Sequence, residues 1–427
     1  MSTKKRLITN FMSLATMQGL NFILPIVTLP YLLQVVGPSK FGLISFAQAF
    51  ITYFIYFTDY GFNFVATREI SIHRDDKKKV AEIFSSVMLV RILLLAISLV
   101  ILLLVVTFIP KFHEYSIIYY LTFGMVIGNV MFPVWFFQGM EHMKVISILN
   151  IISKSVFTIG IFVFVKHQDQ FLIVPILNSL GYIAVGIAAL YIILIRYKVK
   201  VVKPTKDQFV HQLKSGWDIF VSNLATSLYT ISNVFILGFF ASNTIVGYYS
   251  SAEKIVKAVS SMISPLIQTV YPFLSRALQD SKERAVGIIN KIFILITVTM
   301  GLLSFALGIF AEPLVNLALG EEYQQSIPLL KILSVLPIVL GWANIFGILT
   351  MINFEYKKQL SRIYVAASIF SVICMVTLIP TLLQYGTAWT AVLTEIFATS
   401  IMAIFLWKKG IHVWKWKNQY SSVENQG

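Results

Sequence analysis

Nine charged residues interrupt stretches of this sequence that are otherwise apolar. Five are basic and four are acidic: Arg91, Lys154, Lys254, Lys257, Lys331, Asp59, Asp218, Glu253 and Glu395. A charge inside hydrocarbon costs several kcal/mol, so such residues face a bundle interior or a water-filled cavity and usually mark the path of a substrate or an ion. A cation half-way through a membrane suits the passage of an anionic group.

Depth separates the basic residues from the acidic ones. Arg91, Lys154 and Lys257 fall about 12–18 Å along their predicted helices, at about 1.5 Å per residue. Asp59 and Asp218 fall near the cytoplasmic ends instead. Lys331 can snorkel to the outer surface. We therefore predict four cavity cations that bind the anionic group: Arg91, Lys154, Lys254 and Lys257.

The acidic residues have two possible roles, as counterions or gate partners of basic residues, or as binding groups for a proton or sodium ion that drives transport. The candidates are Asp59, Asp218, Glu253 and Glu395, with Arg68 as a gate partner. Glu253 precedes Lys257 by four residues, the spacing of a helical ion pair. Asp59 and Arg68 lie on opposite faces of an ideal helix, so their pairing requires a break near Gly61, where glycine lowers the cost of bending.

Polar residues form stripes along four of the predicted helices. In the predicted helix at about 245–275, seven residues fall within about 80° of the helix circumference when each residue turns the helix by about 100°. They are Ser250, Glu253, Lys257, Ser261, Ser264, Gln268 and Tyr271. At about 41–64 a matching set occurs 205 residues earlier: Ser45, Gln48, Thr52, Tyr56, Asp59 and Asn63. Helices at about 7–33 and 215–241 match in the same way. GLISFAQ (42–48) and GYYSSAE (247–253) align at this offset, which indicates two parallel repeats.

Lipid cannot solvate these stripes, so they must face a polar cavity or one another. If they face a cavity they form a binding surface, which we predict from these residues: Gln48, Thr52, Thr226, Asn233, Ser261, Ser264 and Gln268. If they face one another they only join helices by hydrogen bonds, as small polar residues do in many membrane proteins.

The elements that must hold these residues are membrane-spanning helices. Hydrophobic residues make up 57% of the chain and charged residues 12%, against about half and a quarter in soluble domains. Uncharged runs such as Phe171–Ile195 and Ile332–Phe354 reach the length of about 20 residues that crosses a bilayer as a helix. Charge clusters and Gly/Pro breaks give twelve spans, at about 7–33, 41–64, 80–109, 115–138, 145–165, 171–195, 215–241, 245–275, 286–311, 327–353, 361–383 and 386–407.

Basic residues predict the orientation of these spans. With the N-terminus in the cytoplasm, 26 of the 34 Lys and Arg residues fall in cytoplasmic segments and 3 in outer loops, the bias that orients membrane proteins. Both termini are therefore predicted to be cytoplasmic, and the start of the chain to be a retained first helix. Six spans on either side of a basic loop divide the chain into an N-terminal lobe (1–200), a basic cytoplasmic linker (201–214), a C-terminal lobe (215–407) and a cytoplasmic tail (408–427).

No pattern for catalysis, metal binding or cofactor binding is present in the sequence. The six histidines show no HxxxH or Cys/His spacing, and GxxxxGK[ST] does not occur. The single cysteine, Cys374, forms no internal disulfide. The net charge of +15 follows the membrane orientation. We therefore expect a protein that is not an enzyme, holds no metal and binds no nucleic acid.

Five segments resemble the polysaccharide flippases of the Wzx type: LPYLLQVVGPSKFGLISFAQAF (29–50), DYGFNFVATREI (59–70), PVWFFQGMEHMK (133–144), GYYSSAEKIVKAV (247–259) and YPFLSRA (271–277). These flippases belong to the wider superfamily of multidrug/oligosaccharidyl-lipid/polysaccharide exporters. The match is specific over about the first 150 residues and over 245–280. Beyond about 285 only hydropathy and length agree.

The resemblance implies an all-α integral membrane protein in which two six-helix lobes form a V around a central cavity. It also implies a substrate, an undecaprenyl-diphosphate-linked oligosaccharide, moved across the bacterial cytoplasmic membrane as an O-antigen or capsule repeat unit. The diphosphate would meet the cavity cations, the sugars would meet the stripes, and the prenyl tail would stay in lipid. Further candidate partners are membrane lipids, a polysaccharide polymerase and a chain-length regulator.

Two other functions stay open at this point. A drug/cation antiporter of the same superfamily would favour an acidic centre rather than a basic one. A membrane-embedded polysaccharide polymerase or ligase generally needs a sizeable outer loop with catalytic basic residues, and the longest predicted outer loop covers only about 312–326.

Overall fold

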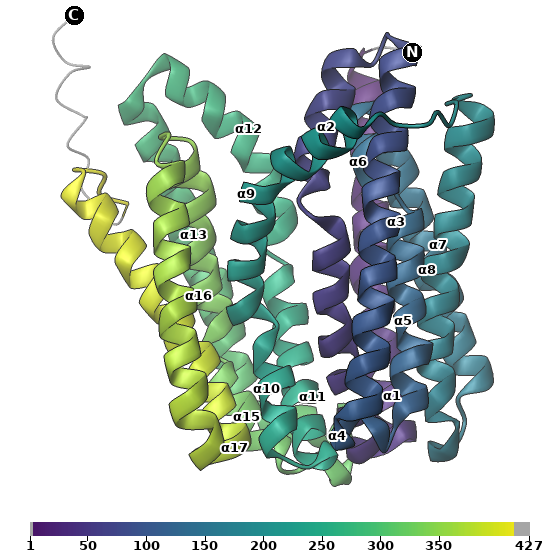
Figure 1. Ribbon diagram of the computed structural model, residues 1–427. Helices are drawn as coiled ribbons and strands as arrows, with labels where there is room; N and C mark the ends of the chain where they lie inside the picture. The colour runs from purple at the N-terminus through teal and green to yellow at the C-terminus, as the bar shows by residue number, and fades with distance from the viewer. Residues whose placement is uncertain (1–2, 414–427) are drawn as a thin grey trace, which may run out of the picture.

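Helices make up every described element of the chain (Figure 1). The computed structural model describes residues 3–413, without the side chains of 3–23, 25, 26, 222, 225, 226, 228–230 and 272. The N-terminal half (3–196) contains α1 (Thr3–Asp59), α2 (Phe62–His73), α3 (Lys77–Phe108), α4 (Pro110–His113), α5 (Ser116–Met131), α6 (Val134–Gly139), α7 (Met143–Phe164), η1 (Gln168–Leu172), α8 (Ile173–Tyr191) and η2 (Ile192–Arg196). The C-terminal half (206–413) contains α9 (Lys206–Thr230), α10 (Ser232–Phe240), α11 (Asn243–Ser261), α12 (Ser264–Asp280), α13 (Lys282–Ile309), α14 (Ala311–Ala318), η3 (Glu321–Tyr323), α15 (Ser326–Leu333), α16 (Leu336–Ala343), η4 (Asn344–Ile352) and α17 (Lys357–Lys408).

Eight helical segments of the described chain are long and apolar enough to cross a membrane: Val27–His73, Lys77–Phe108, Ser116–Gly139, Met143–Phe164, Gln168–Arg196, Lys282–Ile309, Ser326–Ile352 and Lys357–Lys408. The most apolar 18-residue stretch of α3 has a mean hydropathy of 3.2, yet only 33% of that stretch is buried inside the protein. Its exposed residues include Ile92 and Val100. Water does not solvate such a surface favourably, and lipid does. The chain is therefore a multi-pass membrane protein.

Local backbone breaks divide the longest helices. α1 is broken at Gly37, whose φ of 71° suits a residue without a Cβ, and α17 is broken at Leu383, with a φ of 48°. α1 ends at Asp59, and α2 begins after Gly61, whose φ is 81°. The structure therefore breaks the predicted span of about 41–64 near Gly61, the break that a pairing of Asp59 with Arg68 requires.

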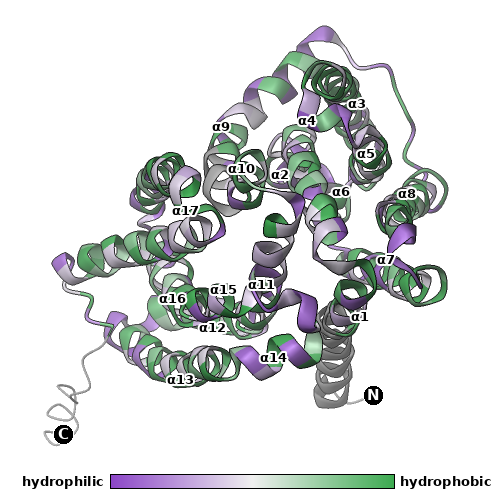
Figure 2. Ribbon diagram, turned by 90° about the horizontal axis from the view of Figure 1, so that it is seen from below, coloured by the Kyte–Doolittle hydropathy of each residue, from purple (hydrophilic) through white to green (hydrophobic). Residues whose placement is uncertain are grey.

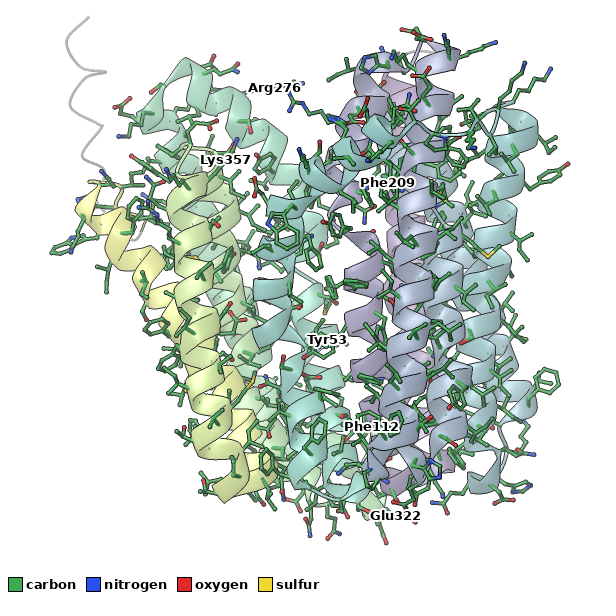
Figure 3. All side chains as sticks on the ribbon, in the orientation of Figure 1. Tyr53, Phe112, Phe209, Arg276, Glu322 and Lys357 are labelled. Carbon is green, nitrogen blue, oxygen red and sulfur yellow. The ribbon has the colours of Figure 1, made fainter. Side chains whose placement is uncertain are left out.

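The helices run between two ends of the molecule. Arg276 and Lys357 lie at one end, which we call the basic end, and Phe112 and Glu322 lie at the opposite end (Figure 3). Viewed along the helices, α3, α5, α7 and α8 of the N-terminal half gather on one side and α13, α16 and α17 of the C-terminal half on the other (Figure 2). α11 lies between the two groups in this view.

Three groups of buried apolar side chains hold the helices together. One of them, the common core, contains residues of both halves, and in it Phe46 and Phe50 of α1 stack on Phe235 of α10 with ring centroids 5.6 and 5.7 Å apart. The other two cores are separate: one packs around Trp135 of the N-terminal half and the other around Met402 of the C-terminal half. Among the described side chains, those of α9 alone depart from this division, because Phe209, Leu213 and Phe220 pack into the core around Trp135.

α1 and α11 cross within the common core in direct backbone contact. A Cβ added to Gly42 would lie 1.7 Å from the carbonyl oxygen of Asn243, and one added to Gly247 would lie 2.0 Å from that of Pro38. The two contacts are reciprocal, because Pro38 and Asn243 are separated by 205 residues, as are the two glycines. Reciprocal contacts are the mark of a two-fold interface. The helices therefore meet through positions that the predicted repeat aligns.

Candidate substrate-binding site

Two neighbouring cavities open between the helices, and their sizes of about 520 and 690 Å³ are typical of small-molecule sites. The smaller, the N-side cavity, takes its walls from both halves: Thr28, Leu29, Leu32, Phe41, Ile44, Gln48, Thr52, Met125, Phe157, Val174, Asn178, Lys254, Lys257 and Ala258. The larger, the C-side cavity, takes its walls from the C-terminal half: Lys257, Ser260, Ser261, Ile263, Ser264, Ile267, Gln268, Tyr271, Leu340, Asn344, Ile348 and Ile352. Lys257 lines both, so the cavities adjoin at this residue.

Seven of the predicted site residues lie in these walls: Gln48, Thr52, Lys254, Lys257, Ser261, Ser264 and Gln268. They reach the cavities because each stripe repeats at helical spacing along one face of α1, or along α11 and α12. The hydroxyl of Thr52 donates to the carbonyl oxygen of Gln48 at 2.6 Å, and the hydroxyl of Ser261 donates to that of Ala258 at 2.7 Å. Both hydroxyl oxygens keep the capacity to accept a hydrogen bond.

The two cavity lysines have different partners. The Nζ atom of Lys257 lies 3.0 Å from Oε1 of Glu253, as their spacing of four residues predicts. The Nζ atom of Lys254 lies 5.0 Å from the ring centroid of Phe41, in a cation–π contact. Within the described part of the chain, no carboxylate lies within 4.0 Å of Lys254. Lys254 is therefore the cavity cation whose charge is available to an incoming anion.

The C-side cavity has both polar and apolar groups in its walls. The amide of Gln268 donates to the hydroxyl of Ser264 at 3.1 Å, and Asn344 donates to the carbonyl oxygen of Leu340 at 2.7 Å. Asn344 opens η4, a π-helical stretch of nine residues, and π-helical turns occur frequently at functional sites. The other lining residues of α16 and η4 are aliphatic: Leu340, Ile348 and Ile352. The cavity can thus hold a molecule with both hydrogen-bonding and apolar faces.

Arg91 does not lie in either cavity, so the prediction that it is a cavity cation is corrected. Its side chain is 1% exposed and donates to the carbonyl oxygens of Thr58 and Asn129 at 3.3 and 3.1 Å, and to Oδ1 of Asn129 at 2.8 Å. The guanidinium also lies 3.7 Å from a carboxylate oxygen of Asp59. Since α1 ends here, Arg91 neutralises the partial negative charge of a helix C-terminus as well as a carboxylate.

In this structure Asp59 pairs with Arg91 and not with Arg68, whereas the predicted gate pairing with Arg68 belongs to a state closed to the cytoplasm. The second carboxylate oxygen of Asp59 accepts a hydrogen bond of 2.6 Å from Asn63. Arg68 lies on the exposed face of α2. The break at Gly61 turns α2 away from α1, and the nearest available cation at that level belongs to α3. The role of Arg68 as a gate residue stays a prediction.

The remaining predicted residues whose side chains are described lie outside the two cavity walls. Lys154 is exposed on α7 and Asp218 on α9, whereas Glu395 is partly buried on α17. Asn233 of α10 is 4% exposed. The side chain of Thr226 lies outside the described residues. Asp218 and Asn233 share helices with a predicted stripe but are absent from the cavity walls, and no stripe is predicted on α7 or α17.

Sequence reasoning missed two amide residues of the cavity walls, Asn178 of α8 and Asn344 of η4. It also missed Asn129, which holds Arg91. Each is a single amide in an otherwise apolar helix. Buried amides need hydrogen-bond partners, so an isolated Asn in a predicted span is itself a signal, although it does not tell a cavity from a helix contact.

The comparisons with known proteins agree with this arrangement. A family model described as "Polysaccharide biosynthesis protein" matches residues 7–278. The chain is 33% identical over 405 residues to a "Putative O-antigen transporter" of Escherichia coli (strain K12), covering 95% of this chain and 98% of that protein. A protein of the same name from Shigella dysenteriae is 27% identical over 404 residues, covering 93% and 98%.

Solved structures share the fold at low sequence identity. The TM-score is 0.74 with the lipid II flippase MurJ in an inward closed conformation, at 14% identity over 92% of this chain and 87% of that one. It is 0.73 with the inward-facing conformation of a multidrug resistance MATE family transporter of the MOP superfamily, at 13% identity over 91% and 94%. It is 0.56 with the outward-facing conformation of such a transporter, at 14% identity over 92% and 94%. The resemblance inferred from the sequence is confirmed, and this chain belongs to the polysaccharide biosynthesis protein family.

Proposed function

We propose that this protein is a flippase for lipid-linked oligosaccharides. It moves undecaprenyl-diphosphate-linked polysaccharide repeat units from the cytoplasmic to the outer leaflet of the bacterial inner membrane. The observation that carries the proposal is the pair of adjoining cavities inside a lipid-exposed helical protein, walled by hydroxyls, amides and an available cation, Lys254. Its relatives named as O-antigen transporters support the same substrate class.

The proposed architecture has twelve membrane crossings in two lobes that form a V. The eight apolar segments give twelve crossings if α1 and α17, each broken once, cross twice, and if α9–α10 and α11–α12 each cross once. The lobes are residues 1–200 and 215–407, joined by the linker 201–214 and followed by the tail 408–427. The common core closes the V at the opposite end, and the separate cores flank its opening at the basic end.

The proposed orientation places the basic end and both termini in the cytoplasm, as the positive-inside bias favours. The higher TM-scores with inward conformations than with the outward-facing one support an inward state for this structure. In this state the cavities receive substrate from the cytoplasmic side.

Within the cavities, Lys254 binds the diphosphate and the polar stripes bind sugar hydroxyls. A cation on an aromatic face is partly desolvated, so an anion that replaces water there gains more than it would at the surface. Lys257 lies at the junction of the two cavities and shares its charge with Glu253. The prenyl tail stays in the lipid. The protein needs no catalytic residue, because translocation makes and breaks no covalent bond.

A proton or sodium gradient is the proposed source of energy. Asp59 and Glu253 are held by Arg91 and Lys257. Glu395 has no basic side chain within 4.0 Å among the described residues, so it is the first candidate for ion coupling, with Asp218 as the second. A polysaccharide polymerase and a chain-length regulator are proposed partners that receive the translocated unit.

Reconstitution into proteoliposomes tests the proposal. The measurement is the fraction of undecaprenyl-diphosphate-linked oligosaccharide that becomes accessible to a membrane-impermeant oxidant. We expect Lys254→Ala to lower the rate at least tenfold and Lys254→Arg to keep part of it, because charge at that depth is what the diphosphate needs. Lys331→Ala, on the exposed surface of α15, is the control and should transport normally. Export of organic cations without movement of the lipid would indicate a drug antiporter instead.

A further inference from the structure

We infer that the C-side cavity is the sugar-selecting subsite of this flippase and that it accepts an uncharged sugar. The inference rests on the proposed function and goes beyond it, because it assigns sugar and diphosphate to different cavities and names the charge of the sugar. Two features carry it: the composition of the cavity walls and the ion pair at its entrance.

The walls of the C-side cavity match the two kinds of surface on a sugar ring. Hydroxyl and amide groups of Ser261, Ser264 and Gln268 line the cavity, and they can exchange hydrogen bonds with ring hydroxyls, as donors and as acceptors. α16 and η4 contribute the aliphatic side chains of Leu340, Ile348 and Ile352, on which C–H faces, deoxy positions or acetyl methyl groups can pack.

The charge of the cavity is set by one ion pair. Among the described residues of the wall, Lys257 alone is charged, and its Nζ atom lies 3.0 Å from Glu253. The carboxylate of Glu253 is 12% exposed and the Lys257 side chain 58% exposed, so the lysine reaches into the cavities while its counterion stays behind it. A sugar carboxylate would have to displace Glu253 or lie beside it, and like charges that share a site oppose each other's ionised forms. An uncharged sugar meets no such conflict.

The neighbouring N-side cavity differs in the partner of its own cation. The half-buried Lys254 contacts the ring of Phe41 instead of a carboxylate. The diphosphate therefore belongs in the N-side cavity, and the first sugars extend past Lys257 into the C-side cavity.

The experiment compares two lipid-linked oligosaccharides that differ only in their sugars, one uncharged and one carrying a uronic acid, in the proteoliposome assay. We expect the wild-type protein to move the uncharged one at least tenfold faster. Glu253→Gln leaves Lys257 without its counterion and should shift the ratio at least tenfold toward the uronic acid. Glu253→Gln combined with Lys257→Gln makes the wall uncharged again and should restore the preference for the uncharged lipid. Glu355→Gln breaks an exposed pair with Lys357 and should leave the ratio unchanged.

A second measurement separates the two cavities. A short-chain prenyl diphosphate without sugar should inhibit transport, and we expect Lys254→Ala to weaken that inhibition at least tenfold while Gln268→Ala leaves it unchanged. Equal transport of the two lipids by the wild-type protein, or an unchanged ratio in Glu253→Gln, overturns the inference but not the flippase function. Failure of the wild-type protein to move either lipid overturns the proposed function itself.

Discussion

Glu69 of α2 accepts a hydrogen bond of 2.8 Å from the side-chain amide of Gln212 of α9, and so joins the two halves near the basic end. The other oxygen of Glu69 lies 3.1 Å from Nε2 of His211. About two helical turns along α9 from Gln212, Phe220 stacks on Tyr60 with ring centroids 4.8 Å apart. α9 therefore bridges halves whose cores are otherwise separate at this end, and we expect a motion that widens the proposed opening between them to break these contacts.

Cysteines at these positions should report that motion. In a Cys374→Ser background, Glu69→Cys with Gln212→Cys should form a disulfide that stops transport, and reduction should restore it, because the link fixes α9 to α2. The measurement is lipid translocation with and without reductant. The control pair is Thr67→Cys with Gln138→Cys, whose side chains lie 3.2 Å apart within one half.

Transport that continues at the normal rate through the oxidised Glu69/Gln212 pair would show that α9 and α2 move together. A loss of transport in the oxidised control pair would show that oxidation itself, rather than the bridge between halves, is responsible.

The buried ion pair of Arg91 and Asp59 predicts a folding defect. Arg91→Ala removes the counterion of Asp59 and the donor to the carbonyl oxygen of Thr58 and to Oδ1 of Asn129, and breaking one side of a buried pair costs about 3–5 kcal/mol. We expect a much lower unfolding temperature in detergent and little protein in the membrane. Asp59→Asn should cost less, because Asn129 and Thr58 still bind Arg91.

A double-mutant cycle distinguishes pairing from substrate binding at this site. The combined Arg91→Ala and Asp59→Asn variant should be little less stable than Arg91→Ala alone, since the two residues act as a unit. An Arg91→Ala protein with unchanged stability but no transport would mean that the guanidinium meets the substrate in another conformation.

The crossing of α1 and α11 predicts an unusual sensitivity to a single methyl group. Gly42→Ala places a Cβ inside the van der Waals radius of the Asn243 carbonyl oxygen, which forces the helices apart, and overpacking of this kind typically costs about 1–3 kcal/mol. We expect a lower unfolding temperature for Gly42→Ala and for Gly247→Ala. Gly287→Ala is the matched control, because its Cβ would meet nothing within 4 Å, and it should be neutral or slightly stabilising. An unchanged unfolding temperature in Gly42→Ala would mean that the crossing is not in place in solution.

Reporter fusions test the orientation. A reporter that is active only in the cytoplasm should work when inserted after residues 75, 203 and 281, and one that is active only outside should work after residue 322, which lies at the opposite end (Figure 3). The physical reason is the concentration of Lys and Arg at the basic end. Activity of the outside reporter at residue 203 would reverse the orientation and the direction of access to the cavities.

Sequence patterns predicted those features of the fold that depend on one helix at a time. Hydropathy located the apolar segments, and Gly61 was recognised as a place where a break costs little, because only a local backbone preference is involved. The breaks at Ile231 and Met262 were not predicted, since neither residue is a Gly or Pro and the helices restart within two residues. Breaks of this kind depend on packing between helices, which one-dimensional periodicity does not describe.

The cavity residues show the same limit. A stripe on one helix correctly placed Gln48, Lys257 and Gln268 on an inner surface, because lipid excludes polar faces. The position of Arg91 along its helix could not show whether its side chain faces a cavity or another helix, since a side chain points inward in both cases. The answer depended on Asn129, which is 38 residues away. The sequence of one helix shows which of its side chains point inward, whereas a contact also depends on the residues of a second helix.

The common core has a consequence for the covalent continuity of the chain. Between η2 and α9 the two halves are linked by residues 197–205, and the backbone amide of Val202 holds this stretch to the hydroxyl of Ser85 at 2.9 Å. The stacked rings and the reciprocal glycine crossing do not depend on this linking segment. Two fragments, 1–200 and 201–427, should therefore assemble when they are produced together. The intact protein then corresponds to a heterodimer whose two subunits are joined by a linker, and each subunit supplies one side of the passage.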